Sequence, residues 1–457
     1  MAPHSRIMAF AAACVLAAGS AAAQSFEKLV DFRCETIGCA PGTTLVEGDD
    51  GFIYGTTSEG GATDRGTVFR MDRGGAVVVL LSPARWFFKA SDGFFYGTTE
   101  EGGAFGSGTV YRMDHSGAAT ELYAFDGVTG GSPTSLVQAA DGLFYGTTAL
   151  GGAAGSGTVF RMDPSGAVTV LRSFEDDSEW VDPLAFFQSP DGFLYGTTYY
   201  GTVFRMDLAG AVTVLRTFAS IYVDMIEGSD GFLYGVTDSG GDVGAGTIFR
   251  MDRAGGTVVL HAFAGPDGAV PIAAPVEASD GFLYGLTNSG GAFGAGVLYR
   301  MDRAGRFAVL HTFDGASGAY GVASLIQAGD GALYGTVALG GAYEQGVAFR
   351  LSLAAPAHHI RVMAPHAGAR WTIGSRQTIR WHNRSDRRAR VRIELSRDAA
   401  RRGKRWRRMS PHERRPGHYR WLVTGPAAGP AVVRVTSMDG RAAAASRWTF
   451  SIGRRRR

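Results

Sequence analysis

The sequence contains little cysteine and, beyond its first residues, no long apolar run. Only three of its 457 residues are cysteine, which excludes a disulfide-dense scaffold. No segment after residue 23 has the ~20 apolar residues that a membrane-spanning helix needs. Cys34 and Cys39 have no nearby His or further Cys, so they fall short of the usual four ligands of a zinc site. We therefore expect no metal, no cofactor and no membrane span.

Familiar catalytic motifs are also absent. There is no Gly-x-Ser-x-Gly nucleophile elbow, and His412-Glu413 is not followed by a second His at the spacing of zinc proteases. The Ser-Asp-Gly turns at Ser91, Ser229 and Ser279 lack the Ser-x-Asp-x-Gly-x-x-Trp order of sialidase-type Asp boxes. These absences favour a non-catalytic protein, although an enzyme can also assemble its site from residues scattered over loops.

The first 23 residues have the pattern of a secretory signal peptide. Arg6 precedes an apolar stretch, Ile7 to Ala18, and the small residues Ala21 to Ala23 end the segment. Cys14 follows three alanines, whereas a lipoprotein signal has a branched aliphatic residue three places before the cysteine. The pattern predicts a secreted protein, periplasmic or extracellular, without a lipid anchor.

Two cysteines remain after such a cleavage, Cys34 and Cys39, with four residues between them. Disulfides persist in the oxidising compartments to which exported proteins go. We expect these two residues to pair; the alternative is two free thiols in a loop.

Glycine is abundant, with 67 residues, and much of it belongs to a unit that returns seven times. Each copy has an Asp-Gly, a short run ending in Tyr-Gly and a segment resembling Gly-Thr-Val-Phe-Arg-Met-Asp. A Gly-rich stretch precedes this segment in every copy but the fourth, where Tyr199-Tyr200 replaces it. The Asp-Gly pairs begin at Asp50, Asp92, Asp141, Asp191, Asp230, Asp280 and Asp330, and the tyrosines are Tyr54, Tyr96, Tyr145, Tyr195, Tyr234, Tyr284 and Tyr334. A period of about 40 to 50 residues indicates one supersecondary unit per repeat.

Each repeat predicts four antiparallel strands. In the sixth repeat these are Ala273–Ala278, Phe282–Thr287, Val297–Met301 and Phe307–Phe313, and Asp280-Gly281 is a strong hairpin signal between the first two. Four strands in a repeat of this length form one blade of a β-propeller. The strands read as nearly continuous apolar runs, which is typical of sheets buried on both faces.

The ends of the repeat array predict how the ring closes. The seventh repeat reaches its third strand, Gly346 to Leu351, but has no fourth strand. The segment Phe26 to Phe32 matches the fourth-strand pattern of Thr257 to Phe263. We therefore expect an all-β fold, a seven-bladed β-propeller over residues 24–353, closed by an N-terminal strand that removes an open edge.

Some recurrent residues indicate scaffold rather than function. The Tyr-Gly glycines predict close approach of a neighbouring backbone or ring. An arginine also recurs in each third strand, and a charge repeated in every blade is expected to be paired or solvated. These arginines are Arg70, Arg112, Arg161, Arg205, Arg250, Arg300 and Arg350.

The composition changes abruptly after a linker at residues 354–359. Of the 45 Lys and Arg residues, 26 lie from His358 onward, together with only five of the 42 acidic residues and five of the seven Trp. Short strands at Gln377–Trp381, Arg390–Leu395, Tyr419–Val423, Ala431–Thr436 and Trp448–Ile452 predict a small Ig-like β-sandwich over residues 360–453. Residues 454–457 form a basic tail.

Candidate binding residues lie in two places. If the strand order is right, the Gly-rich loops and the connections between blades share one face. Most residues of these loops are small, and Trp180, Tyr199 and Tyr200 are aromatic exceptions. Charged or aromatic exceptions also occur at Glu100, Glu101, Asp176, Asp177, Asp242, Tyr343 and Glu344. In the basic domain, Arg405, Trp406 and Arg407 combine cations with an aromatic ring, a combination suited to polyanions. For each of these residues the alternative is an ordinary solvated side chain.

The repeat, legible at Asp141 to Phe174 and Asp280 to Phe313, resembles that of the choice-of-anchor, or Gloeo/Verruco (GloVer), repeat family of exported bacterial proteins. The resemblance implies a propeller-like domain on secreted or surface proteins. The C-terminal part resembles the Ig-like domain of the KNH-like cell-wall-synthesis family through residues such as Trp371, Trp381 and Trp421. This second resemblance implies a module associated with the cell envelope or with glycans.

Two functions remain open at this point. The first is a secreted, non-catalytic, monomeric binding or structural protein of the envelope. Its basic domain would contact glycan or another polyanion, with no specific nucleic-acid role. The second is a glycan-acting hydrolase or lyase that uses carboxylates of the propeller loops, such as those at Glu175, Asp176, Asp177 and Glu179.

Overall fold

The computed structural model describes residues 24–62, 64–81, 86–174, 183–198, 200–220, 222–320, 325–353, 360–365, 369–383, 391–397, 407–413, 417–424, 428–437, 443–445 and 450–453. The regular structure in these residues is β-strand, and no helix among them is long and apolar enough to cross a membrane. The predicted signal peptide (1–23), linker (354–359) and tail (454–457) lie outside the described residues. The chain divides into two compact units, Phe26–Ser352 and the described residues from Leu353 onward.

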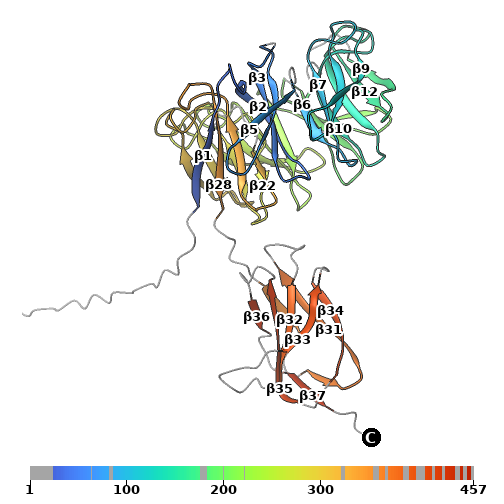
Figure 1. Cartoon of the computed structure of the whole chain (residues 1–457), viewed down its shortest axis with the longest axis vertical. Helices are drawn as coiled ribbons and strands as arrows, with labels where there is room; N and C mark the ends of the chain where they lie inside the picture. Colours follow the sequence, from blue (N-terminus) through green and yellow to red (C-terminus); the bar gives the residue numbers. More distant parts are fainter. Residues whose placement is uncertain are drawn as a thin grey trace, which may run out of the picture. The chain divides into compact units, whose positions relative to one another are not determined.

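The first unit contains, in its described residues, seven antiparallel four-stranded sheets, which we number in chain order (Figure 1). Sheet 1 contains β2 (Cys39–Glu47), β3 (Ile53–Glu59), β4 (Thr67–Met71) and β5 (Val77–Leu81). Sheet 2 contains β6 (Trp86–Lys89), β7 (Phe95–Thr99), β8 (Thr109–Met113) and β9 (Ala119–Ala124). Sheet 3 contains β10 (Gly131–Gln138), β11 (Phe144–Leu150), β12 (Thr158–Met162) and β13 (Val168–Ser173).

The remaining sheets repeat this order. Sheet 4 contains β14 (Pro183–Gln188), β15 (Leu194–Thr198), β16 (Thr202–Met206) and β17 (Val212–Thr217). Sheet 5 contains β18 (Val223–Glu227), β19 (Leu233–Thr237), β20 (Thr247–Met251) and β21 (Thr257–Ala262). Sheet 6 contains β22 (Val276–Glu277), β23 (Leu283–Leu286), β24 (Val297–Met301) and β25 (Phe307–Thr312). Its first strand is much shorter than the predicted Ala273–Ala278.

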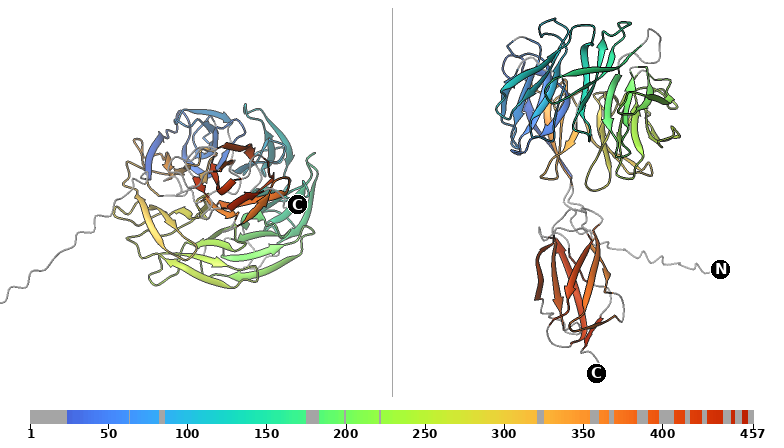
Figure 2. Two further views of the ribbon diagram at one scale, coloured as in Figure 1. Left: turned by 90° about the horizontal axis from the view of Figure 1, so that it is seen from below. Right: turned by 90° about the vertical axis from the view of Figure 1, so that its right-hand side faces the viewer.

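Sheet 7 joins the two ends of the repeat array. It contains β26 (Leu325–Gln327), β27 (Leu333–Val337), β28 (Val347–Ser352) and, hydrogen-bonded to β28, the N-terminal strand β1 (Ser25–Asp31). The strand that the sequence lacks after β28 is therefore supplied by the start of the chain, as predicted. In Figure 2 the sheets of this unit follow one another around a common centre.

The Asp-Gly and Tyr of each repeat form one local motif. In sheet 3, Oδ1 of Asp141 accepts a hydrogen bond from the backbone N–H of Leu143, and Oδ2 accepts one from the Tyr145 hydroxyl at 2.9 Å. The Asp–Tyr bond is present in all seven sheets, at 2.7 to 2.9 Å. Because the seven tyrosine rings are buried, the carboxylate satisfies a hydroxyl that would otherwise lose its water.

The glycine after each tyrosine makes room for an aromatic ring. Gly146 is paired with Phe160 across the sheet, and a Cβ at Gly146 would lie 2.4 Å from Cζ of that ring. Gly55, Gly235 and Gly335 have the same relation to Phe69, Phe249 and Phe349. The predicted close approach at these glycines is confirmed, and the neighbour is the phenyl ring of the third strand.

The repeated arginine and the second aspartate also have structural partners. Arg205 lies 4.8 Å from the ring of Phe193, a cation–π contact, and Arg70, Arg112, Arg250 and Arg300 stack in the same way. Asp163 closes the turn before the fourth strand, because its Oδ1 accepts hydrogen bonds from the N–H groups of Ser165 and Ala167. Both residues belong to the scaffold.

Adjacent sheets are joined by the residue that stands three places before each Asp-Gly aspartate. In five sheets its side chain accepts a hydrogen bond from the turn of the preceding sheet, as Gln138 does from Ser91 N at 2.8 Å. In sheet 2, Lys89 instead pairs with Asp49, and in sheet 5 Arg253 bridges Glu227 to Asp191. The residues at this position are Glu47, Lys89, Gln138, Gln188, Glu227, Glu277 and Gln327.

Three of these junctions share a charge pattern. Where the joining residue is Glu47, Glu227 or Glu277, an arginine follows the third-strand Asp and pairs with both that glutamate and the aspartate of the preceding turn. The arginines are Arg73, Arg253 and Arg303. Where the joining residue is Gln, that position is Pro164, Leu208 or Leu353. Glu and Arg therefore occur together; in sheet 2, where the joining residue is Lys89, the same position is His115.

Burial follows the position of a strand in its sheet. The second and third strands are buried on both faces, as the apolar runs predict; β12 is buried at four of its five residues. The fourth strands differ from the expectation of continuous burial: β13, which contains most of the apolar run Ala167–Leu171, is intermediate or exposed along its length. The fourth strand is an edge strand, so one of its faces and its free edge meet solvent.

The second unit consists of two sheets around one core. A three-stranded sheet contains β29 (Ile360–Ala364), β31 (Arg376–Asn383) and β34 (His418–Leu422). A six-stranded sheet contains β30 (Arg370–Thr372), β37 (Phe450–Gly453), β35 (Ala428–Ser437), β32 (Val391–Ser396), β33 (Arg407–Glu413) and β36 (Ala443–Ala445). The predicted strands are present with shifted ends, while β29, β30, β33 and β36 were not foreseen.

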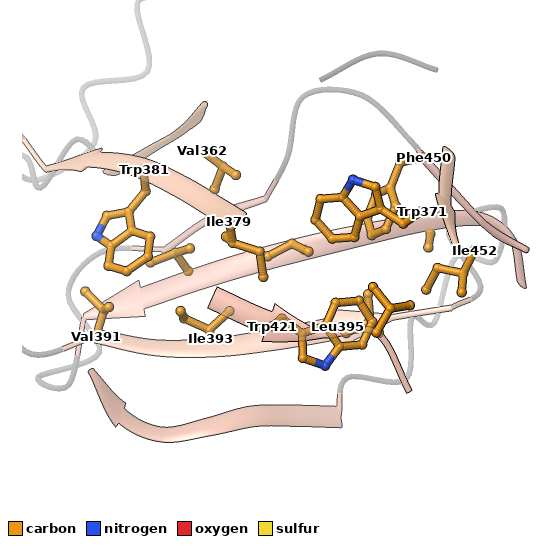
Figure 3. Packing of buried hydrophobic residues seen from close by; sticks show 14 residues of the cluster. Val362, Trp371, Ile379, Trp381, Val391, Ile393, Leu395, Trp421, Phe450 and Ile452 are labelled. Atoms are coloured by element: carbon orange, nitrogen blue, oxygen red, sulfur yellow. The ribbon is translucent and has the colours of Figure 1, made fainter. Parts of the chain in front are cut away.

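Tryptophans fill the core between these sheets (Figure 3). The ring of Trp371 lies 4.5 Å from Phe450 and 5.9 Å from Trp421, and Trp381 is buried beside Ile379 and Val391. Three of the five tryptophans in this part of the chain therefore serve packing.

Candidate binding face

The Gly-rich loops and the connections between sheets lie side by side on one face of the first unit. The connection from sheet 5 to sheet 6 illustrates this arrangement. Phe263 N donates to Gly246 O in the loop of sheet 5, and Gly291 N in the loop of sheet 6 donates to Gly265 O, at 3.0 and 2.8 Å. The same two bonds recur around Gly127 and Gly315. We call this surface the loop face.

Apolar side chains stand at the tips of the Gly-rich loops. The residue two places after the Gly-Gly pair is Phe105 in sheet 2, Val243 in sheet 5, Phe293 in sheet 6 and Tyr343 in sheet 7. Their side chains are 65%, 65%, 68% and 51% exposed. Large exposed apolar groups at equivalent positions of one surface are typical of an interaction site. Sheets 5, 6 and 7 are consecutive, so three of the tips come from adjacent sheets.

Many carboxylates on the loop face have structural partners. Asp126 accepts hydrogen bonds from the N–H groups of Val128 and Thr129, Asp267 lies 2.9 Å from the His261 ring, and Glu101 pairs with Arg65 at 2.9 Å. The backbone hydrogen bonds hold the pKa of Asp126 below its usual value. These contacts fix the loops, and a carboxylate with a lowered pKa, such as Asp126, is poorly suited to act as a general acid.

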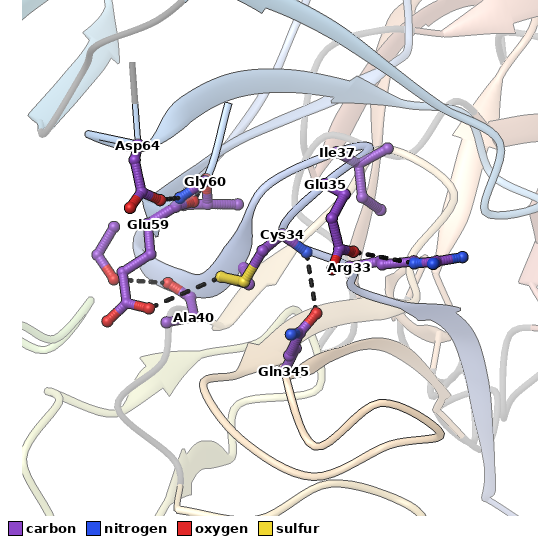
Figure 4. Close-up of a disulfide and its surroundings, with 12 residues drawn as sticks. Arg33, Cys34, Glu35, Ile37, Ala40, Glu59, Gly60, Asp64 and Gln345 are labelled. Atoms are coloured by element: carbon purple, nitrogen blue, oxygen red, sulfur yellow. Dashed lines mark hydrogen bonds and ion pairs between the residues drawn. A yellow bond between two sulfur atoms is a disulfide. The ribbon is translucent and has the colours of Figure 1, made fainter. Parts of the chain in front are cut away.

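The disulfide Cys34–Cys39 is present at the loop face (Figure 4). It closes the connection between sheet 7 and sheet 1, where Cys34 N donates to Oε1 of Gln345 at 2.9 Å. Arg33, in the same segment, lies 5.3 Å from the ring of Tyr343. Glu59 lies near both sulfurs, but sulfurs bonded to each other are not the thiolates that metal binding requires. The disulfide loop therefore supports one of the exposed tips.

The predicted aromatic residues of this face are only partly described. Tyr200 is 51% exposed and lies in the short connection between β15 and β16, where Gly201 N donates to Thr198 O at 3.0 Å. Trp180 and Tyr199 lie outside the described residues, as do the carboxylates at 175–179. The structure therefore places Tyr200 on the loop face and does not test its two predicted companions.

The predicted binding cluster of the second unit is also only partly described. Arg407 is exposed on β33, at the edge of the six-stranded sheet, whereas Arg405 and Trp406 lie outside the described residues. Sequence reasoning missed two other groups: the loop tips Phe105, Val243 and Phe293, and exposed arginines on β31 and β34. The tips could have been found by comparing the seven repeats position by position, because they occupy the same place after Gly-Gly.

Comparisons with known proteins complete the description. No curated protein matches this chain. The lectin BP39L from Burkholderia pseudomallei is 11% identical, with a TM-score of 0.43 over 67% of this chain and 98% of the lectin. Domains 1–6 of the surface layer protein SbsC are 11% identical, with a TM-score of 0.19 over 94% of this chain and 52% of SbsC. Similarities this low carry no conclusion about this chain.

The repeats give a definite assignment. The Gloeobacter/Verrucomicrobia repeat matches residues 82–225 and 221–369, which together span more than half of the sequence and six of the seven Asp-Gly turns. The chain belongs to the Gloeobacter/Verrucomicrobia repeat family.

Proposed function

We propose that the chain is a secreted, non-catalytic binding protein of the cell envelope, in which the seven sheets are the blades of a propeller closed by β1. The loop face binds a glycan, and the second unit is an Ig-like module that contacts a polyanion. Export is supported by the signal-like first 23 residues and by the disulfide, which suits an oxidising compartment.

The observation that carries the proposal is the set of exposed loop tips. Phe105, Phe293 and Tyr343 offer ring faces on which the C–H groups of a sugar ring can pack, and the surrounding loops offer backbone N–H and C=O groups for its hydroxyls. Tyr200 adds a fourth ring at the short loop of sheet 4, beside the predicted positions of Tyr199 and Trp180. Because the tips repeat from sheet to sheet, a polymer with a repeating sugar unit suits the face better than a single small molecule.

The test uses the mature full chain and an array of neutral and acidic glycans. Substitution of two adjacent tips, Phe293→Ala with Tyr343→Ala, is expected to weaken glycan binding about tenfold or more, since exposed aromatic anchors dominate such contacts. The thermal midpoint should stay unchanged because both side chains are exposed. A matched control, Val258→Ala with Val259→Ala at two exposed positions of β21, should bind like the wild type.

The outcome that contradicts this proposal is equal binding by the tip variant and the control. Turnover of any polysaccharide in the array, lost on substitution of the carboxylates at 175–179, would instead support the hydrolase or lyase. No observation on the described residues favours that alternative.

A further inference from the structure

The three-stranded sheet of the second unit has one face of arginine. On β31 and β34 the side chains of Ile379 and Trp421 are buried in the core. Successive residues of a strand point to opposite sides, and on the other side Arg376, Arg380 and Arg420 are exposed. We call these three residues the arginine face.

The strand register places the three arginines in a triangle. Arg420 is paired with Thr378, which lies between Arg376 and Arg380 on the neighbouring strand. Four residues along a strand span about 13 Å, and neighbouring strands lie about 5 Å apart. The three arginines therefore leave the sheet at separated points, with Thr378 among them.

No acidic group balances this charge in the described part of the chain. The side chains of Arg376, Arg380 and Arg420 make no hydrogen bond or ion pair with any described residue. The carboxylate of Glu394 lies on β32, in the other sheet, and pairs with Arg434 at 2.8 Å and with Arg392 at 3.7 Å. As far as the described residues are concerned, the positive charge of the arginine face is therefore available to an external anion.

We propose that the arginine face binds a linear acidic polysaccharide through its carboxylate or sulfate groups. Guanidinium groups bind such oxyanions with two parallel hydrogen bonds and keep their charge at any physiological pH. A flexible chain of repeated anions can meet three separated cations at once, while Thr378 offers a hydroxyl to the sugar. The inference deepens the proposed function by naming the polyanion and the residues that hold it.

Other anionic partners fit this face less well. Binding of single-stranded nucleic acid relies on aromatic side chains that stack on bases, and the described tryptophans of these two strands point into the core. Insertion into lipid needs a broad apolar surface, whereas Leu422 is the one large apolar side chain exposed on the described part of these strands. Duplex DNA and anionic vesicles are therefore comparison partners in the test.

The experiment measures binding of the mature full chain to alginate of defined length over a series of NaCl concentrations. The triple variant Arg376→Gln, Arg380→Gln, Arg420→Gln is expected to bind about tenfold more weakly at 0.15 M salt, on the scale of three exposed ion pairs, and to show a shallower salt dependence. Its thermal midpoint should equal that of the wild type. A control with the same change in charge, Arg216→Gln, Arg306→Gln, Arg370→Gln, uses exposed arginines outside the candidate binding residues and should keep wild-type binding.

Three results would overturn the proposal. Loss of alginate binding in the control but not in the triple variant would place the anion on another part of the chain. Equal weakening in both would mean that net charge alone attracts the polymer. Tighter binding of duplex DNA or of phosphatidylglycerol vesicles, lost in the triple variant, would change the partner. None of these results affects the loop-face test, which uses Phe293 and Tyr343.

Discussion

The carboxylate of Glu47 accepts a hydrogen bond of 2.6 Å from the backbone N–H of Gly329, although 282 residues separate the two in the sequence. Glu47 also pairs with Arg73, whose guanidinium reaches Asp330 in the same turn at 3.3 Å. The contact joins sheet 1 to sheet 7 with the chemistry that joins consecutive sheets elsewhere. The seam between the two ends of the repeat array therefore has the same hydrogen bond and ion pairs as the junction between sheets 5 and 6.

Removal of this contact should cost measurable stability. We expect Glu47→Ala to lower the free energy of unfolding by about 2 kcal/mol, because it deletes a hydrogen bond to a charged acceptor and leaves Arg73 with one partner fewer. Glu47→Gln should recover part of the loss, since Gln makes the same backbone contact at Gln138, Gln188 and Gln327. Urea unfolding measures both, with Glu121→Ala on exposed β9 as the control. Equal losses in the Ala and Gln variants would contradict this role.

The disulfide should stabilise the same seam. Reduction, or Cys34→Ser with Cys39→Ser, is expected to destabilise the protein by about 2 kcal/mol, the chain-entropy value for a short loop. The segment it closes holds Gln345 and Tyr343 of sheet 7 beside sheet 1. Thermal unfolding with and without reductant, together with a free-thiol assay, tests this. A wild-type protein that shows two free thiols without reductant would refute the pairing.

The repeat made most of the first unit predictable. The Asp-Gly turn, the tyrosine and the glycine occur in every copy because each has a fixed partner within its own sheet, as Asp141 with Tyr145 and Gly146 with Phe160. The junction residues were not foreseen. Glu47 and Gly329 are far apart in sequence, and the bond between them depends on the order of sheets in space. The pairing of Glu with Arg at equivalent positions is the one signal that a comparison of repeats could have revealed.

The glycine after the tyrosine offers a direct test of the packing within a sheet. Gly146→Ala is expected to destabilise the protein by about 1 to 3 kcal/mol, because the new Cβ would overlap the Phe160 ring and the backbone oxygen of Ser135. The control is Gly142→Ala, in the turn, where φ is 82° and a Cβ would have open space around it. It should lower the free energy of unfolding by only about 1 kcal/mol, because alanine is strained at a positive φ.

A second substitution tests whether overlap with the Phe160 ring causes the loss of stability in Gly146→Ala. Addition of Phe160→Leu to Gly146→Ala removes the ring and leaves the contact with the Ser135 oxygen, so the double variant should lose less stability than the sum of the single variants. When Gly142→Ala is combined with Phe160→Leu, the stability losses of the two substitutions should add. Additivity in both cases would mean that the ring does not limit residue 146.

The binding surfaces were less predictable than the fold. Tyr343 was named from the sequence because it is an aromatic residue in a loop of small residues, but Phe293 occupies the same place and was passed over. In the second unit, the sequence showed a dense run of cations around Arg407 but no such run at Arg380 and Arg420. These two arginines are far apart in the chain and become neighbours only because β31 pairs with β34. Spacing along the chain reveals local clusters, whereas these sites are formed by strand pairing and sheet order.

The buried tyrosines predict a loss of stability at alkaline pH. Burial, followed by the hydrogen bond to the neighbouring aspartate, raises the pKa of Tyr145, Tyr195 and Tyr234 to about 12, against about 10 for an exposed tyrosine. The folded state therefore favours the neutral hydroxyl, so its contribution to stability is complete below pH ~10 and is lost as the pH rises towards 12.

This loss can be assigned to the tyrosines by measuring ionisation and unfolding together. Ultraviolet absorbance of the native protein should show a group of tyrosines that ionise well above pH 10, and urea unfolding between pH 9 and 11.5 should show the fall in stability. The triple variant Tyr145→Phe, Tyr195→Phe, Tyr234→Phe should be less stable at pH 8, because three aspartates lose a donor, yet should decline less steeply with rising pH. If the native tyrosines all ionise near pH 10, or if the variant keeps the wild-type slope, the Asp–Tyr pairs do not set the alkaline limit of this fold.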